Sequence, residues 1–172
     1  HLRYALEHGV KQADIDLALL LDSEPSLEGN ISEIASLYER AANRGDPDGL
    51  LEYGLLLLKG KGVNADPKKG MELLLKAAES NNPNALFNIA YVYDQGIGFP
   101  QNKTTAFKWY ERAREKGNPR ALQRIAEMLI KGEGTPKDVK KGIQIFEKLG
   151  DAGDRYSQWY LGDLFRLGKY VP

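Results

Sequence analysis

Apolar and polar positions recur along the chain at intervals of 36 residues. Residues 47–59, PDGLLEYGLLLLK, show the pattern. A small residue is followed four positions later by a hydrophobic residue, and a second small residue comes directly after that one. A bulky residue lies three positions after the second small residue. The four occurrences are Gly49, Tyr53, Gly54 and Leu57; Ala85, Ile89, Ala90 and Tyr93; Ala121, Ile125, Ala126 and Leu129; and Ser157, Leu161, Gly162 and Phe165. Apolar spacings of three and four residues indicate amphipathic helices, whereas no segment alternates as a strand does.

Capping residues mark where these helices begin. Asp or Asn stands directly before proline at 46–47, 82–83 and 118–119, and Asp154 occupies the same column. The short side chain can accept hydrogen bonds from free backbone N–H groups, and proline suits the first helical position. We therefore expect a first helix in each unit, helix A, at about 11–23, 47–59, 83–95, 119–131 and 155–167.

Glycines and a second capping column divide each unit in two. A glycine closes helix A at Gly60, Gly96, Gly132 and Gly168. Glycine adopts the left-handed backbone that commonly ends a helix. A second set of caps then follows at Asn30, Asp66, Asn102 and Asp138. These signals predict helix B at 31–44, 67–80, 103–116 and 139–152, ending at Gly45, Asn81, Gly117 and Gly153.

Such units must stack on one another. Helices of about 13 residues are marginal alone, and one helix pair cannot bury its own apolar face. The sequence therefore predicts an all-α fold, an α-solenoid of 36-residue helix–loop–helix repeats that forms a single domain over 1–172. The units lie at about 9–44, 45–80, 81–116, 117–152 and, in part, 153–172, with 1–8 as the tail of a preceding helix. We expect further repeats, or a cap, beyond at least one end.

The combined pattern over residues 2–170 resembles the Sel-one-like repeats (SLR), relatives of the tetratricopeptide repeats. Besides the columns above, it includes the Gly-x-Gly loop after helix A and bulky pairs before small residues in helix B, as in WYERA and LLKAA. The first loop, DSEPSLEGN, lacks Gly-x-Gly, and Tyr170 replaces the second glycine of the last unit. The resemblance implies a right-handed superhelix with helix A on the concave side and helix B outside.

The resemblance also implies a function. We expect a non-enzymatic scaffold or adaptor that binds a partner protein or peptide along the helix-A groove, as a bacterial envelope, secretion or signalling component. An alternative is an immunity or inhibitor protein that neutralises a toxic effector. A further alternative is purely architectural: the groove closes on itself or on another copy, and in the second case the chain forms a homo-oligomer. Periplasm or envelope is favoured over cytoplasm by the family alone.

Composition removes several other classes of function. Lysines plus arginines balance aspartates plus glutamates at 24 each, so no net charge attracts nucleic acid. There is no cysteine, and the two histidines are His1 and His8. A thiolate site therefore has no residue to draw on, and a multi-histidine metal site or a serine–histidine triad has almost none. No apolar run approaches the roughly 20 residues of a membrane span. We expect no catalytic, cofactor or metal site, no membrane insertion and no enzymatic activity.

Two sequence features invite a chemical interpretation. The KGKGV segment at 59–63 could cradle phosphate, but a P-loop needs wider glycine spacing and Lys-Ser/Thr at the start of a helix. Here the glycines follow a helix and recur in later units, which predicts a structural turn. Asp66 and Asp138 could be catalytic acids, but their column also holds asparagine, which predicts capping.

Lysines gather near the loops between helices A and B. They are Lys59, Lys61, Lys68, Lys69, Lys137, Lys140 and Lys141. Two interpretations fit this cluster: a solvated rim, or a basic edge that meets an acidic partner.

One stripe of helix A is predicted to face the groove. Leu51, Leu55 and Leu58 are spaced four and three residues apart, as on a single helix face. The candidate partner-binding residues are Leu51, Leu55, Leu58, Phe87, Tyr91, Asp94, Gln123, Glu127, Ile130, Trp159, Asp163 and Arg166. These side chains either pack on their own neighbours in a tight superhelix or form a partly apolar track for a helix or extended peptide. In the second case the large aromatics Phe87, Tyr91 and Trp159 are natural hot spots.

Overall fold

The computed structural model describes residues 13–23 and 31–168, and within these ranges every regular element is an α-helix. The helices are α2 (Ala13–Ser23), α3 (Ile31–Asn43), α4 (Pro47–Lys59), α5 (Pro67–Glu79), α6 (Pro83–Gln95), α7 (Lys103–Glu115), α8 (Pro119–Lys131), α9 (Val139–Asp151) and α10 (Arg155–Arg166). Even-numbered helices are the predicted A helices and odd-numbered ones the B helices. The predicted all-α solenoid is confirmed. The expectations for 1–8, Tyr170 and most of the first loop fall outside the described residues.

The capping columns act as the sequence predicts. The Oδ1 atom of Asp46 accepts hydrogen bonds at 3.0 Å from the backbone N–H groups of Asp48 and Gly49. Asn82 and Asn118 make the same pair of bonds at the starts of α6 and α8. The caps of the B helices, Asp66, Asn102 and Asp138, each accept one such bond at 2.9–3.0 Å. Because aspartate and asparagine make the same bonds, these columns require an acceptor rather than an acid.

The Gly-x-Gly loops join neighbouring repeats. The second glycine, Gly134, has φ +69°, and a Cβ atom there would lie 2.1 Å from the carbonyl oxygen of Lys103 at the start of α7. In the preceding units Gly98 approaches Pro67 and Gly62 approaches Ile31 in the same way. The KGKGV glycines thus bring an A–B loop onto the start of the preceding helix B. They are required by backbone conformation and close contact, which explains their recurrence.

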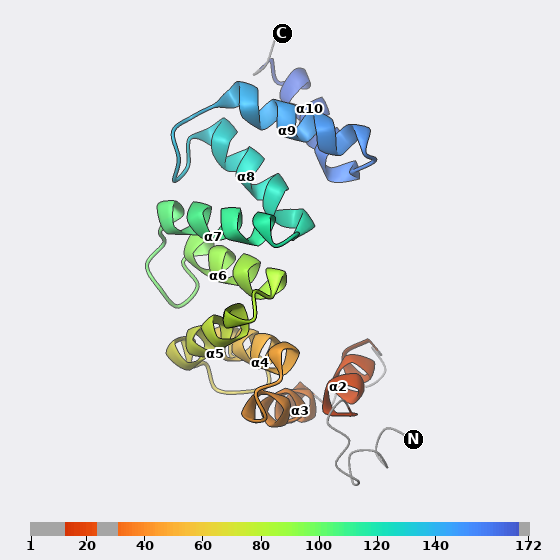
Figure 1. Cartoon of the computed structure of the whole chain (residues 1–172), viewed down its shortest axis with the longest axis vertical. Coiled ribbons are helices and arrows are strands. Elements are labelled where there is room, and N and C mark those ends of the chain that lie inside the picture. Colours follow the sequence, from red (N-terminus) through yellow and green to blue (C-terminus); the bar gives the residue numbers. More distant parts are fainter. Residues whose placement is uncertain (1–12, 24–30, 169–172) are drawn as a thin grey trace.

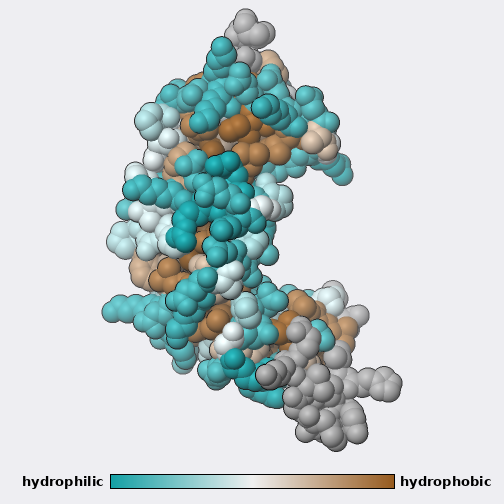
Figure 2. All heavy atoms as spheres, viewed as in Figure 1, coloured by the Kyte–Doolittle hydropathy of each residue, from teal (hydrophilic) through white to brown (hydrophobic). Residues whose placement is uncertain are grey.

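The helix pairs follow one another along a curve. All extensive helix–helix contacts join helices that are consecutive in sequence, from α2 with α3 to α9 with α10. In Figure 1 the two end helices, α2 and α10, both lie toward the right-hand side of the stack. The space-filling view shows that this side is hollowed between the two ends (Figure 2). The fold therefore presents one concave side, along which side chains from successive repeats line up.

The buried apolar residues form two clusters. The larger one runs from α2 to α8, and its last members are Ile125, Met128 and Leu129. The smaller one joins α8, α9 and α10 and consists of Ala126, Ile130, Ile143, Phe146 and Leu164. Helix α8 contributes one face to each cluster, so the last repeat packs on a core of its own.

Candidate functional site

The structure places the twelve predicted groove residues at very different depths. Six are buried: Leu51, Leu58, Phe87, Asp94, Glu127 and Ile130. Leu55, Gln123 and Asp163 are half-buried, and Tyr91, Trp159 and Arg166 are exposed. Packing on neighbouring helices therefore accounts for Leu51 and Leu58, whereas Tyr91 and Trp159 remain accessible. That any of these residues contacts a partner stays a prediction.

Phe87 is anchored within the protein although it was expected to be a hot spot. Its side chain is only 8% exposed, and its ring centroid lies 5.3 Å from that of Tyr110 on α7. The guanidinium of Arg120, on the next helix A, lies 4.9 Å above the same ring. Phe87 thus ties three helices together and shows little surface to a partner.

A buried carboxylate, Asp94, organises the middle of the stack. It accepts hydrogen bonds from Lys103 Nζ at 2.7 Å and Tyr110 Oη at 3.2 Å, and it pairs with the guanidinium of Arg124. Gln95 Nε2 also donates to it at 3.2 Å. A carboxylate removed from water is stable only when it is paired in this way. Asp94 therefore joins α6, α7 and α8 rather than facing an open groove.

The network continues from Arg124 to the last helix. Arg124 Nη1 donates to Glu127 Oε2 at 2.6 Å, and the hydroxyl of Tyr156 donates to Glu127 Oε1 at 2.7 Å. Three successive A helices, α6, α8 and α10, are thereby connected through Asp94, Arg124, Glu127 and Tyr156. We call these four residues the groove network. It fixes how the A helices sit against one another.

The pKa shifts in the groove network are those of groups that stabilise the fold. Burial opposes ionisation of Asp94, but hydrogen bonds from Lys103 and Arg124 outweigh it and hold the pKa of that carboxyl below its usual value. Burial, followed by the bond to Glu127, raises the pKa of Tyr156. Asp94 thus stays ionised and Tyr156 neutral near pH 7. Neither group is poised to exchange a proton at neutral pH, as a general acid or base must be.

An aromatic surface lies at the α10 end of the groove network. The rings of Tyr156 and Trp159 are 5.8 Å apart, and their side chains are 40% and 62% exposed. Tyr160 lies beside both rings and stacks on the buried Phe146 at 4.5 Å. We call Tyr156, Trp159 and Tyr160 the α10 aromatic patch. Its rings are held by the core below them while Trp159 projects outward.

A second accessible feature lies between α6 and α8. A hollow of about 470 Å³ is lined by Phe87, Asn88, Tyr91, Gln95, Arg120 and Arg124. Tyr91 is 40% exposed at its edge. The hollow offers an aromatic ring and guanidinium groups together, which suits a peptide side chain with a π-face or a carboxylate.

Sequence reasoning missed Arg124 and Lys103, the cations that neutralise Asp94. The Arg124 column holds Asn88 and Tyr160 in the neighbouring units, and the Lys103 column holds Pro67 and Val139. The one sequence signal for these cations was Asp94 itself. The equivalent positions in the neighbouring repeats hold the apolar Leu58 and Ile130, so a carboxylate there requires positively charged partners nearby.

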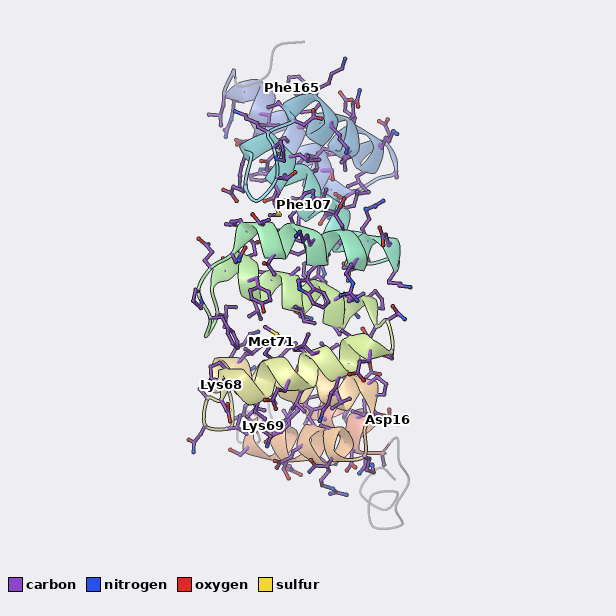
Figure 3. All side chains as sticks on the ribbon, turned by 60° about the vertical axis from the view of Figure 1, so that its left-hand side comes forward. Asp16, Lys68, Lys69, Met71, Phe107 and Phe165 are labelled. Carbon is purple, nitrogen blue, oxygen red and sulfur yellow. The ribbon has the colours of Figure 1, made fainter. Side chains whose placement is uncertain are left out.

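The lysines near the A–B loops are all exposed. Figure 3 shows Lys68 and Lys69 projecting at the start of α5. The ammonium of Lys69 lies 5.6 Å from the ring of Tyr53. Over the described ranges none of the seven lysines makes an ion pair, so their positive charge faces solvent.

Membrane-spanning helices and metal-binding clusters are both absent from residues 13–23 and 31–168. In these ranges no helix is long and apolar enough to cross a bilayer. The same ranges hold no group of three or more histidine, aspartate or glutamate side chains placed to bind a metal ion.

Comparison with protein families gives a match along most of the chain. The model described as Sel1 repeat matches four consecutive segments, residues 35–46, 47–82, 83–118 and 119–154. The three complete segments each begin at the proline of a helix A and end at the cap of the next one. A comparison with functionally curated proteins gave no significant match.

Solved structures with the same architecture come from several bacteria. A Sel1 repeat protein from Oxalobacter formigenes is 28% identical, with a TM-score of 0.78 over 92% of this chain and 64% of its own. The protective antigen c5321 of uropathogenic Escherichia coli, described as having an SLR fold, is 24% identical, with a TM-score of 0.80 over 97% of this chain and 36% of its own. Helicobacter pylori cysteine rich protein B is 18% identical, with a TM-score of 0.56 over 80% of this chain and 98% of its own. The chain thus spans less than two thirds of the first two proteins.

Proposed function

Because the chain belongs to the Sel1 repeat family, whose members generally mediate protein–protein interactions, we propose that it is a non-enzymatic scaffold that binds a partner along its helix-A side. The partner is a protein or peptide that lies across successive A helices. Its apolar side chains meet the α10 aromatic patch, and its other end reaches the hollow beside Tyr91.

The observation that carries this proposal is the match to four consecutive Sel1 repeats. Trp159, which is 62% exposed on α10, is the residue through which we test it. Single exposed hydrophobes are normal, but here an exposed tryptophan stands over a pre-arranged group of aromatic rings. Glu127 holds Tyr156 through a hydrogen bond, and Phe146 holds Tyr160 by stacking. Because these side chains are already ordered, they lose little conformational entropy when a partner binds. Tryptophan and tyrosine are also the residues in which binding energy concentrates.

Charged groups at the edges of the groove can set the register of the partner. Asp94 and Glu127 are buried and paired, so they do not serve this role. Arg120 and Arg166 are exposed, on α8 and α10. Such rim charges affect orientation and association rate more than affinity.

The bacterial origin of the solved relatives supports, as part of the same proposal, a role in a bacterial envelope, secretion or signalling assembly. Cell fractionation followed by detection of the tagged protein tests the location. Recovery in the cytosol alone would contradict an envelope role and leave the binding role to be judged separately.

Affinity capture from the native host tests the binding role. The wild-type protein and Trp159→Ala are used as matched baits, and retained proteins are quantified by mass spectrometry. We expect at least one protein to be retained by the wild type and depleted with Trp159→Ala. If both baits retain only the same proteins in the same amounts, or only copies of themselves, the proposal is wrong.

A further inference from the structure

A second hollow, of about 420 Å³, lies where the end of α8 meets α9 and α10. Its floor is apolar and is formed by Ile130, Val139, Ile143 and Leu164, with the ring of Tyr160 along one side. Lys131 and Lys137 stand at its edge. We call it the lysine-rimmed hollow. Figure 2 shows hydrophobic surface in the neighbourhood of α8 and α9, bordered by hydrophilic residues.

The equivalent positions in the earliest complete repeat are also apolar. Moving back by 72 residues replaces Ile130, Ile143 and Leu164 with Leu58, Met71 and Val92. These three side chains are at most 6% exposed and belong to the large core cluster. Met71 lies between α5 and α6 in Figure 3. At this junction, as at the later one, the three apolar side chains are buried in the core.

The site in the next repeat is occupied by charges instead. There Asp94 replaces Ile130, Phe107 replaces Ile143, and Arg124 replaces Tyr160. The long side chains of Lys103 and Arg124 reach Asp94. Phe107 is labelled on α7 in Figure 3. This junction is closed by the groove network.

The third junction keeps the apolar residues of the first but lacks the two cations of the second. Val139 occupies the position equivalent to Lys103, so a long side chain is missing there, and Tyr160 occupies the position equivalent to Arg124. The Tyr160 ring is stacked on Phe146 at 4.5 Å and is held against that ring. Val139 and Tyr160, which line the hollow, are half-buried, whereas Ile130, Ile143 and Leu164 in its floor are only 1–9% exposed.

Both signs of charge lie around the hollow. Lys131 and Lys137 line it. Burial raises the pKa of Tyr160, and Glu127, Glu133 and Asp163 lie close enough to raise it further. Lys137 makes no ion pair with any residue in the described ranges, and Lys131 approaches Glu127 only at 3.7 Å. Lys140 and Lys141 are exposed on the first turn of α9. Of the nearby acids, Glu133 pairs with Lys103 at 3.1 Å, and Asp138 caps α9. An occupant that adds carboxylates at the edge would therefore be attracted.

We propose that the lysine-rimmed hollow binds an acidic segment of the partner, with one leucine, isoleucine or phenylalanine in the hollow. Aspartate or glutamate residues on either side of that apolar residue meet Lys131 and Lys137. The inference rests on the proposed function, since Ile130 belongs to the predicted groove, and it names the chemistry of the partner at this end. The apolar side chain supplies burial and the carboxylates supply orientation.

Methyl NMR with a defined probe tests the site directly. The probe is a ten-residue peptide with two central leucines flanked by aspartates, and the full 172-residue chain is titrated with it. We expect shifts concentrated on the methyl groups of Ile130, Val139, Ile143 and Leu164. The methyls of Leu58, Met71 and Val92, at the equivalent positions two repeats earlier, serve as the internal control. Absence of shifts at millimolar peptide, or equal shifts at both sites, would overturn the proposal.

Variants and control peptides separate apolar from ionic contributions. Lys131→Glu with Lys137→Glu should weaken binding at least about tenfold, whereas Lys76→Glu with Lys148→Glu, the same charge change on exposed lysines elsewhere, should change it less than twofold. A peptide with alanines for leucines, or lysines for aspartates, should not bind. Equal effects of both double variants would overturn the assignment to this hollow.

One outcome distinguishes this inference from the proposed function. If the captured partner depends on Trp159 but keeps its affinity for the Lys131→Glu, Lys137→Glu protein, the scaffold role stands and the acidic-segment inference is wrong. If capture is independent of Trp159 while the acidic peptide still binds the hollow, the proposed role of the aromatic patch is wrong and the acidic-segment inference stands.

Discussion

At the scale of single residues, Asp94 shows what a repeat pattern can and cannot predict. Its column marks it as facing the helix-A side, and in the neighbouring repeats that column holds Leu58 and Ile130. Helical spacing gives the direction of a side chain but not what covers it. The cover comes from Lys103 and Arg124, which lie 9 and 30 residues away in sequence. Burial of Asp94 therefore became visible only with the structure.

Replacing Asp94 with asparagine should destabilise the protein by about 2–3 kcal/mol, because it leaves Lys103 and Arg124 without the buried anion that pairs with both. Urea unfolding at pH 7 measures the change. The matched control is Asp163→Asn, which breaks a surface pair with the largely exposed Arg166 and should cost less than about 0.5 kcal/mol. Equal losses in the two variants would show that the groove network does not stabilise the fold.

The same carboxylate predicts a pH dependence. Its native pKa is depressed by its cations, so its stabilising contribution is complete above the unfolded value of about 4 and is lost as the pH falls through the native pKa. The difference in unfolding free energy between wild type and Asp94→Asn should therefore shrink on going from pH 6 to pH 3. A difference that stays constant over this range would contradict the depressed pKa.

Phe87 and Tyr91 should respond differently to truncation although they lie one helical turn apart on α6. Phe87→Ala removes a ring that is 8% exposed and packed on Tyr110, and should cost about 3 kcal/mol of stability. Tyr91→Ala removes a ring that is 40% exposed and should cost less than about 1 kcal/mol. Thermal and urea unfolding of both variants provide the comparison. If Phe87→Ala is as stable as Tyr91→Ala, the described packing around Phe87 is wrong.

At the scale of helices, local signals predict most of the fold. Asp46, Asn82 and Asn118 begin their helices where the sequence places them, and the A helices end at Gly60, Gly96 and Gly132. Capping and left-handed glycine involve atoms only a few residues apart, so sequence alone reveals them. The contact of each A–B loop with the preceding helix B joins residues about 31 apart and has no such local signal.

Two glycine substitutions separate loop conformation from contact between repeats. Gly117 and Gly134 both have positive φ, but a Cβ at Gly117 would meet nothing within 4 Å, whereas one at Gly134 would meet the backbone of Lys103 at 2.1 Å. Gly117→Ala should cost about 1 kcal/mol through backbone strain alone. Gly134→Ala should cost at least about 2 kcal/mol more, because α7 and the loop must move apart. Similar unfolding free energies for the two variants would contradict the close approach of loop and helix.

At the scale of the whole molecule, the curved stack places equivalent positions of successive repeats along one concave side. Because the residues at these positions differ between repeats, the chemistry of the surface changes along that side. The junctions share one backbone plan, yet one holds Leu58 and its apolar neighbours, one holds the charges around Asp94, and one holds the lysine-rimmed hollow. The sequence predicts the stack and the stripe of residues along it. It does not separate exposed Trp159 from buried Ile130, because that depends on side chains contributed by two or three other helices.

The central claim is that a partner protein binds through the α10 aromatic patch. It is tested most directly by titrating the captured partner against the wild type, Trp159→Ala and Leu75→Ala, with helix content checked by circular dichroism. Leu75 is the control because it is also exposed, at 42%, but lies on a helix B. We predict that Trp159→Ala weakens binding by more than about 1 kcal/mol, roughly fivefold, while Leu75→Ala leaves it unchanged. Unchanged affinity in Trp159→Ala, or an equal loss in both variants, would contradict the account.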